Sequence, residues 1–144
     1  MVVQLFNASN SSRAEGFEAL SAACQVAGWI QLQPPQVSVP MVSEAALPGG
    51  SGFVIASGGS TGGQGFCVQP RANLDASAEA TARWLLGIGI DPQNSVLLNP
   101  LPLHHISGLM PWWRSRVWGA QHLPLEPDWI KEPALMSAQI DALA

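Results

Sequence analysis

The sequence predicts an α/β protein in which a layered sheet is flanked by helices. Short apolar runs alternate along the chain with longer stretches of helical periodicity, and these stretches carry residues that typically begin or end helices. The chain of 144 residues is 47% hydrophobic and 11% charged, which is enough apolar material for one sizeable core. We therefore expect residues 1–144 to form a single domain.

Four short apolar runs are expected to form strands, because glycine or proline bounds each of them. The runs GFVIAS and GFCVQP flank a glycine-rich stretch, and SVLLNP ends at Pro100. The predicted strands are residues 53–57, 65–69, 95–98 and 120–123. Between residues 31 and 52 the sequence has no hydrophobic period, so we expect an irregular segment there.

Three stretches have the period of a helix, and the predicted helices are residues 13–28, 74–88 and 107–118. The first begins with the capping-box pattern of Ser12 and Glu15, and Gly28 is placed to end it. For the second, Asn73 or Asp75 is the expected N-cap.

The third helix is indicated by apolar residues at helical spacing, namely Ile106, Leu109, Met110, Trp113 and Val117. Ser107 is its expected N-cap, which leaves Pro111 near the first turn, where a missing N–H costs little. Gly119 is expected to end it.

Charge and composition exclude several classes of function. The net charge is −4 and Lys131 is the only lysine, whereas phosphate-backbone binding needs clustered cations, so we expect no nucleic-acid partner. No apolar run approaches the ~20 residues of a membrane helix, and the N-terminus lacks a signal-peptide pattern. Cys24 and Cys67 fit two reduced thiols better than a disulfide framework. We expect a cytoplasmic protein without a membrane partner.

The stretch SGGSTGGQGF, residues 57–66, combines five glycines with three hydroxyl side chains and no charge. Glycines let backbone N–H groups converge on an anion, and the hydroxyls of Ser57, Ser60 and Thr61 are further donors. The stretch matches neither a Walker A motif nor a dinucleotide fingerprint. The alternative is a plain hairpin connection.

A second candidate site is LNPLPLHHISGLMPWWR, residues 98–114. His104 and His105 lie between a strand end and a helix start, where ligands often bind in α/β sheets. A metal site is disfavoured because no carboxylate or cysteine lies nearby in sequence. Serine–histidine catalysis is disfavoured because no G-x-S-x-G elbow is present. The alternative is one packed and one solvated histidine.

Taken together, the two segments resemble the adenylate-forming acyl-CoA synthetases (AMP-binding family), whose phosphate loop has the pattern T-S-G-[ST]-T-G-x-P-K-G and is followed by P-[LM]-[FY]-H. The residues that match the loop are Ser57, Gly58, Gly59, Ser60, Thr61 and Gly62. Those that match the second motif are Pro102, Leu103, His104 and His105. The run LPLHHISGLMP is most similar to 2-succinylbenzoate–CoA ligases of menaquinone and phylloquinone biosynthesis. The resemblance spans about residues 53–125.

The resemblance implies a partial N-terminal domain of an ATP-dependent ligase that adenylates a carboxylate and then forms a CoA thioester. Its partners would be small molecules: an aromatic or other carboxylate, ATP with Mg²⁺, and CoA. The glycine stretch would hold the phosphates. The implied substrate pocket contains His104, at a gating position, His105, Ser107 and Gly108.

Two departures from the family pattern qualify this implication. Gly63, Gln64 and Gly65 occupy the region of the loop lysine, so phosphate binding would rest on neutral donors. The family's later motifs do not occur in the 144 residues. We therefore expect an N-terminal fragment that is inactive alone and binds no cofactor tightly. Apolar surface left exposed on an incomplete domain would favour a homo-oligomer.

Two alternatives remain open. One is a non-enzymatic α/β module for binding or assembly, which has lost the loop lysine because it no longer needs phosphate. The other is an unrelated α/β hydrolase-like protein that uses His105.

Overall fold

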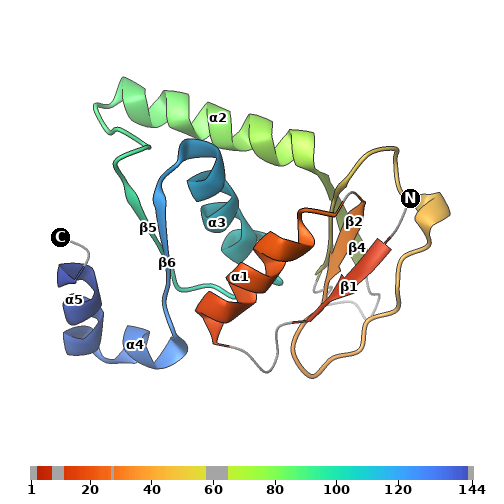
Figure 1. The fold of residues 1–144 in the computed structure, drawn as a ribbon, viewed down its shortest axis with the longest axis horizontal. Helices are drawn as coiled ribbons and strands as arrows, with labels where there is room; N and C mark the ends of the chain where they lie inside the picture. The colour runs from red at the N-terminus through yellow and green to blue at the C-terminus, as the bar shows by residue number, and fades with distance from the viewer. Residues whose placement is uncertain (1–2, 8–11, 27, 58–64, 143–144) are drawn as a thin grey trace.

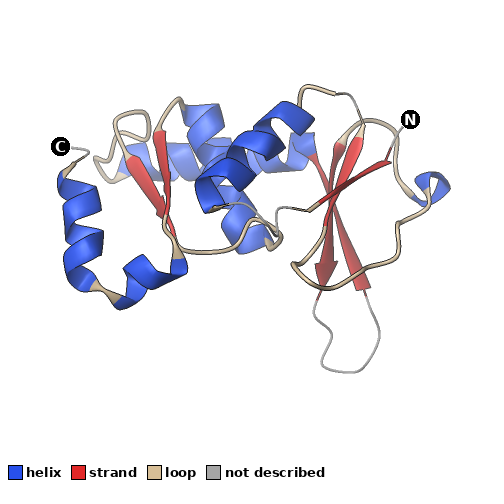
Figure 2. Cartoon of the chain, turned by 60° about the horizontal axis from the view of Figure 1, so that its bottom comes forward, coloured by secondary structure: helices blue, strands red, loops and turns tan. Residues whose placement is uncertain are grey.

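The computed structural model describes residues 3–7, 12–26, 28–57 and 65–142, and it confirms the α/β prediction. Figure 2 shows two separate sheets with helices between them. The strands are β1 Val3–Phe6, β2 Trp29–Leu32, β3 Gly52–Ser57, β4 Gly65–Pro70, β5 Val96–Asn99 and β6 Gln121–Pro124. The helices are α1 Arg13–Ala23, α2 Arg71–Gly87, α3 Ile106–Trp118, α4 Pro127–Lys131 and α5 Pro133–Asp141, with a 3₁₀ turn at Glu44–Ala46.

The larger sheet has the order β1-β2-β3-β4. β1, β2 and β3 run parallel, and β4 returns antiparallel beside β3. The smaller sheet contains only β5 and β6, which run parallel. α3 packs against both strands of this pair, and α1 packs against β6 (Figure 1).

All four predicted strands are present within one residue at either end, but the prediction missed β1 and β2. The expected irregular segment is wrong at its start, because residues 31 and 32 belong to β2. Gln31 is fully buried there, and a buried glutamine does not signal a strand. Its side chain donates to the Pro40 carbonyl at 2.8 Å and accepts from the Val42 N–H at 2.8 Å. It therefore anchors the irregular chain that follows.

The predicted capping box of α1 is confirmed. The Glu15 carboxylate accepts from the Ser12 N–H at 2.9 Å, and the Ser12 hydroxyl accepts from the Glu15 N–H at 3.3 Å. The expected end at residue 28 is wrong: α1 ends at Ala23, and Gly28 adopts a φ of 131° beyond the helix.

The other two N-cap predictions are also wrong. α2 begins at Arg71, directly after Pro70, because the proline that ends β4 already has a helix-compatible φ of −57°. α3 begins at Ile106 with His105 as N-cap, so Pro111 lies inside the helix and not near its first turn. Gly119 ends α3 as expected, with a φ of 71°.

The main core lies between the larger sheet and helices α1, α2 and α3. Its centre is aromatic: the Trp113 ring meets the Phe53 ring edge-on, with centroids 5.5 Å apart. The Trp113 Nε1–H donates to the Asp75 carboxylate of α2 at 2.8 Å. One side chain therefore joins α3 to β3 and to α2. Within the described residues, no helix is both long and apolar enough to cross a membrane.

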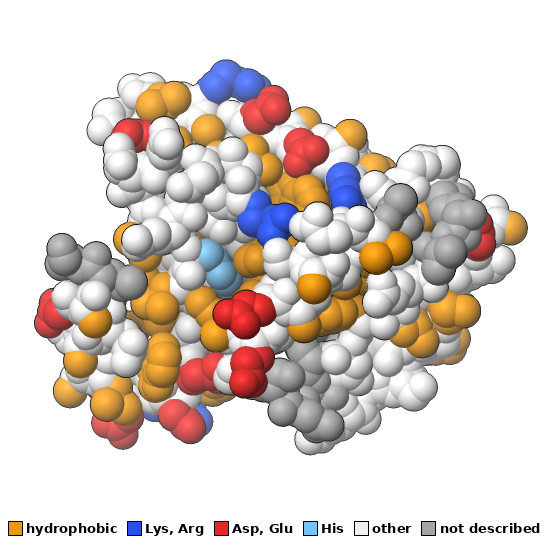
Figure 3. All heavy atoms as spheres, in the orientation of Figure 1, with side chains coloured by type: hydrophobic (Ala, Val, Ile, Leu, Met, Phe, Trp, Pro, Cys, Tyr) orange, Lys and Arg blue, Asp and Glu red, His pale blue; other side chains and the backbone are white. Residues whose placement is uncertain are grey.

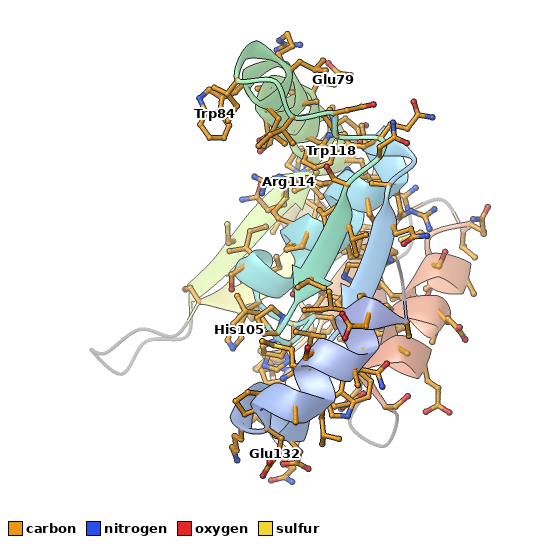
Figure 4. The ribbon with its side chains drawn as sticks, turned by 90° about the vertical axis from the view of Figure 1, so that its left-hand side faces the viewer. Glu79, Trp84, His105, Arg114, Trp118 and Glu132 are labelled. Carbon is orange, nitrogen blue, oxygen red and sulfur yellow. The ribbon has the colours of Figure 1, made fainter. Side chains whose placement is uncertain are left out.

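Replacing Trp113 by Phe is expected to lower the free energy of unfolding by about 1–3 kcal/mol, because the Asp75 carboxylate loses its donor while the ring contact is kept. Urea unfolding followed by circular dichroism measures this. Trp84→Phe is the matched control: Trp84 is 64% exposed on α2 (Figure 4), and its change is expected to stay within ~0.5 kcal/mol. Equal effects of the two substitutions would show that the hydrogen bond from Trp113 to Asp75 does not stabilise the fold.

Candidate functional site

The glycine-rich stretch connects two antiparallel strands. Ser57 ends β3 and is paired with Gly65, which begins β4. A Cβ on Gly65 would lie 2.5 Å from the Ser57 hydroxyl oxygen, so a side chain at position 65 would require the Ser57 hydroxyl to turn away. The other predicted phosphate-binding residues, Gly58, Gly59, Ser60, Thr61 and Gly62, lie outside the described residues. The connectivity is that of a hairpin, and Ser57 is exposed at its base.

The second predicted segment leads from the end of β5 into α3. The His105 N–H donates to the Pro102 carbonyl at 3.2 Å, and the His105 carbonyl accepts the first helical hydrogen bonds of α3. The rings of His104 and His105 lie side by side, with centroids 4.3 Å apart. His105 is exposed at the start of α3 (Figure 4), whereas His104 is partly buried.

Burial, together with the nearby His105 and Arg13, lowers the pKa of His104 to about 4. His104 is therefore neutral at pH 7, and one of its ring nitrogens is available to accept a hydrogen bond.

A cavity of about 260 Å³ lies beside His104. The start of α1, the turn after β2, the turn before α3 and the start of α4 line it: Ser12, Arg13, Gly16, Phe17, Gln33, Pro35, Pro102, Leu103, His104, Glu126 and Pro127. Its wall includes His104 and not His105. The volume suits a small organic group with an apolar body.

Arg13 and Glu126 fix the shape of this cavity. The Arg13 guanidinium donates to the carbonyls of Pro100 and Leu125, the latter at 2.6 Å. The Glu126 carboxylate accepts from the Arg13 N–H at 2.7 Å. Neither residue is predicted from the sequence, because each lies about 90 or more positions from its partner. An arginine at the start of a helix is the only local signal, and it is a weak one.

Gly108 allows α3 to begin against the turn that precedes it. A Cβ at this position would lie 2.1 Å from the Pro102 carbonyl oxygen. Ser107 is exposed, and Pro111 has no N–H to donate to the Ser107 carbonyl. The structure therefore brings His104, His105, Ser107 and Gly108 together in one turn, with His104 alone on the cavity wall.

Among the described residues, no group of three or more His, Cys, Asp or Glu side chains is placed to hold a metal ion. Of the expected triphosphate donors, the described residues contain only the Ser57 hydroxyl. The other predicted donors to ATP and Mg²⁺ belong to residues 58–64, which lie outside the described residues.

No protein-family model and no curated protein matches this chain. Among solved structures, it is similar to o-succinylbenzoate coenzyme A synthetase (MenE) from Bacillus subtilis in complex with AMP, at 20% identity and a TM-score of 0.47. That comparison covers 85% of this chain and 36% of the other. For the same enzyme with the acyl-adenylate OSB-AMP, the identity is 20%, the coverages 84% and 36%, and the TM-score 0.46. The chain thus spans about a third of the length of these structures.

Gly108→Ala is expected to lower the free energy of unfolding by about 1–3 kcal/mol or more, because the new methyl group overlaps the backbone of Pro102. Gly87→Ala is the matched control, since a Cβ there meets nothing within 4 Å and alanine favours helices by ~0.5–1 kcal/mol. Thermal unfolding of both variants tests this. A Gly108→Ala protein as stable as the control would show that the turn has room to move.

The protein is expected to lose stability as the pH falls from about 6.5 towards 4. The pKa values of His104 and His122 are about 4 in the folded state, below the ordinary 6.5, so the unfolded chain binds more protons within that window. Urea unfolding at pH 7.0, 6.0 and 5.0 measures the slope, and either His104→Gln or His122→Gln should reduce it. Above about pH 8 both histidines are neutral in both states, and the substitutions should leave the slope unchanged there.

Proposed function

We propose that this chain is an N-terminal part of an ATP-dependent acyl-CoA ligase of the adenylate-forming type, most similar to 2-succinylbenzoate–CoA ligases. The observation that carries the proposal is the order and separation of SGGSTGG and LPLHHISGLMP in the sequence. Their positions are compatible with it: the first follows β3 and the second follows β5, and ligands of α/β proteins commonly bind at carboxyl ends of strands.

In the proposed reaction, a substrate carboxylate attacks the α-phosphate of ATP and releases pyrophosphate, and the CoA thiol then displaces AMP. The chain's own contribution is binding and orientation. Backbone N–H groups of the glycine stretch and the hydroxyls of Ser57, Ser60 and Thr61 would hold the phosphates, with Mg²⁺ sharing their charge. His105 and Ser107, exposed at the start of α3, would face the acyl group or the adenylate.

The cavity beside His104 supports a gating position for this residue. His104 lines the cavity, its ring centroid is 4.3 Å from that of His105, and its imidazole is neutral at pH 7. A neutral ring can turn without moving a charge, so access past His104 would cost little electrostatic energy.

A second candidate is a non-enzymatic binding or assembly module, and the missing loop lysine favours it. The region of that lysine holds Gly63, Gln64 and Gly65, so the loop has no cation to offer a triphosphate. Such a module would bind ATP no better than it binds inorganic phosphate.

The deciding measurement is pyrophosphate release with ATP, Mg²⁺, 2-succinylbenzoate and CoA, on this chain and on a version extended downstream in its reading frame. We expect turnover from the extended protein and none from the 144 residues, because alignment of both substrates contributes up to ~7–11 kcal/mol and needs all of the binding groups. ATP should bind the short chain with millimolar affinity or weaker, about −4 kcal/mol.

The double substitution Ser60→Ala and Thr61→Ala in the extended protein should reduce turnover, whereas Ser38→Ala, an exposed serine outside both segments, should not. Comparable turnover by the short chain would refute the fragment interpretation. An absence of pyrophosphate release from both proteins would favour the non-enzymatic module.

A further inference from the structure

Asn99 is a fully buried polar residue at the end of β5, and its side chain makes three contacts. The amide nitrogen donates to the Gly108 carbonyl at 2.7 Å, and the amide oxygen accepts from the Leu101 N–H at 3.2 Å. The same nitrogen lies 3.0 Å from the Nε2 of His122 on β6. One side chain thus joins the two ends of the turn that carries His104 and His105.

These partners leave one orientation for the amide. Exchanging its oxygen and nitrogen would set two donors against each other at Leu101 and two acceptors against each other at Gly108. The second hydrogen of the amide nitrogen then points at Nε2 of His122, which must accept it with a lone pair. The proton of the neutral His122 ring is therefore on Nδ1.

The surroundings of His122 keep the ring neutral. Its ring meets the Phe17 ring edge-on at 4.7 Å, and it lines a cavity of about 270 Å³. The charged groups on this side are Glu18 of α1, which lines the same cavity, and Arg116 of α3, which donates to Ser21 and covers the Trp112 ring. Burial lowers the pKa of His122 to about 4.

We infer that Asn99 is a positioning residue for the turn from Leu101 to Gly108, and that His122 fixes the Asn99 amide by accepting a hydrogen bond at Nε2. The turn carries the proposed substrate-facing groups, so the functional part of this inference rests on the proposed function. A protonated His122 would present a donor to the Asn99 donor, and the amide would have to leave one of its other partners.

Solution NMR of the protein without ligands tests the inference through two substitutions of His122. At pH 7 the His122 ring should show the Nδ1–H tautomer. His122→Gln places an amide oxygen near the position of Nε2 and should leave the amide signals of Leu101 and Gly108 in place. His122→Phe keeps a ring but has no acceptor, and should move these signals. An Nε2–H tautomer, or equal shifts in the two variants, would overturn the inference and leave His122 as a packing residue.

Asn99→Asp gives a second, independent readout. An ionised carboxylate can still accept from Leu101 and would accept from a protonated His122, so it should raise the pKa of His122 above about 4, although it sets an acceptor against the Gly108 carbonyl. An unchanged His122 pKa in a folded variant whose new carboxyl is ionised would overturn the inference. If the variant does not fold, or if the new carboxyl is protonated and donates to Gly108, the two His122 substitutions decide. These readouts need neither ATP nor CoA, so the inference can fail while the ligase proposal stands, and the reverse.

Discussion

The packing of two adjacent tryptophans of α3 is the contact on which the rest of this fold depends. Trp113 meets Phe53 of the larger sheet and donates to Asp75 of α2, while the Trp112 ring lies 5.9 Å from the Phe17 ring of α1. Adjacent residues of a helix point in directions about 100° apart, so the pair contacts both flanking helices and the sheet at once. Trp118 adds a hydrogen bond from its Nε1–H to the Ala78 carbonyl of α2. The position of α3 is therefore fixed from three sides.

The geometry of the candidate site follows from the position of α3. Its first turn presses against Pro102, which only a glycine at position 108 permits, and the chain from β5 must turn within a few residues to reach it. The buried amide of Asn99 satisfies the polar groups of that turn. His104 then lies on the wall of a cavity that Arg13 and Glu126 complete. The site is thus a junction of four segments, and no single motif forms it.

The side of the molecule formed by β5, β6 and α5 is apolar and exposed. Val96 and Leu98 of β5 are 41% and 39% exposed, although parallel strands are normally covered on both faces. α5 buries none of its side chains, and the end of α2 exposes Leu86 and Ile88. Figure 3 shows hydrophobic side chains gathered between α5 and the smaller sheet. The low share of charged residues in the sequence is therefore explained by an apolar surface as much as by the core.

The sequence by itself determined the α/β class, the positions of four strands and three helices, and the capping box of Ser12 and Glu15. These are local properties, because apolar periodicity and capping depend on residues a few positions apart. It did not predict β2, where a buried Gln31 is satisfied by the distant Pro40 and Val42, nor the division of the strands into two sheets. It predicted a site at the His104–Gly108 segment, and it did not single out Arg13, Asn99, His122 or Glu126. Their partners lie on other elements, so only the tertiary structure, which brings the start of α1 against the ends of β5 and β6, decided which side chains complete the site.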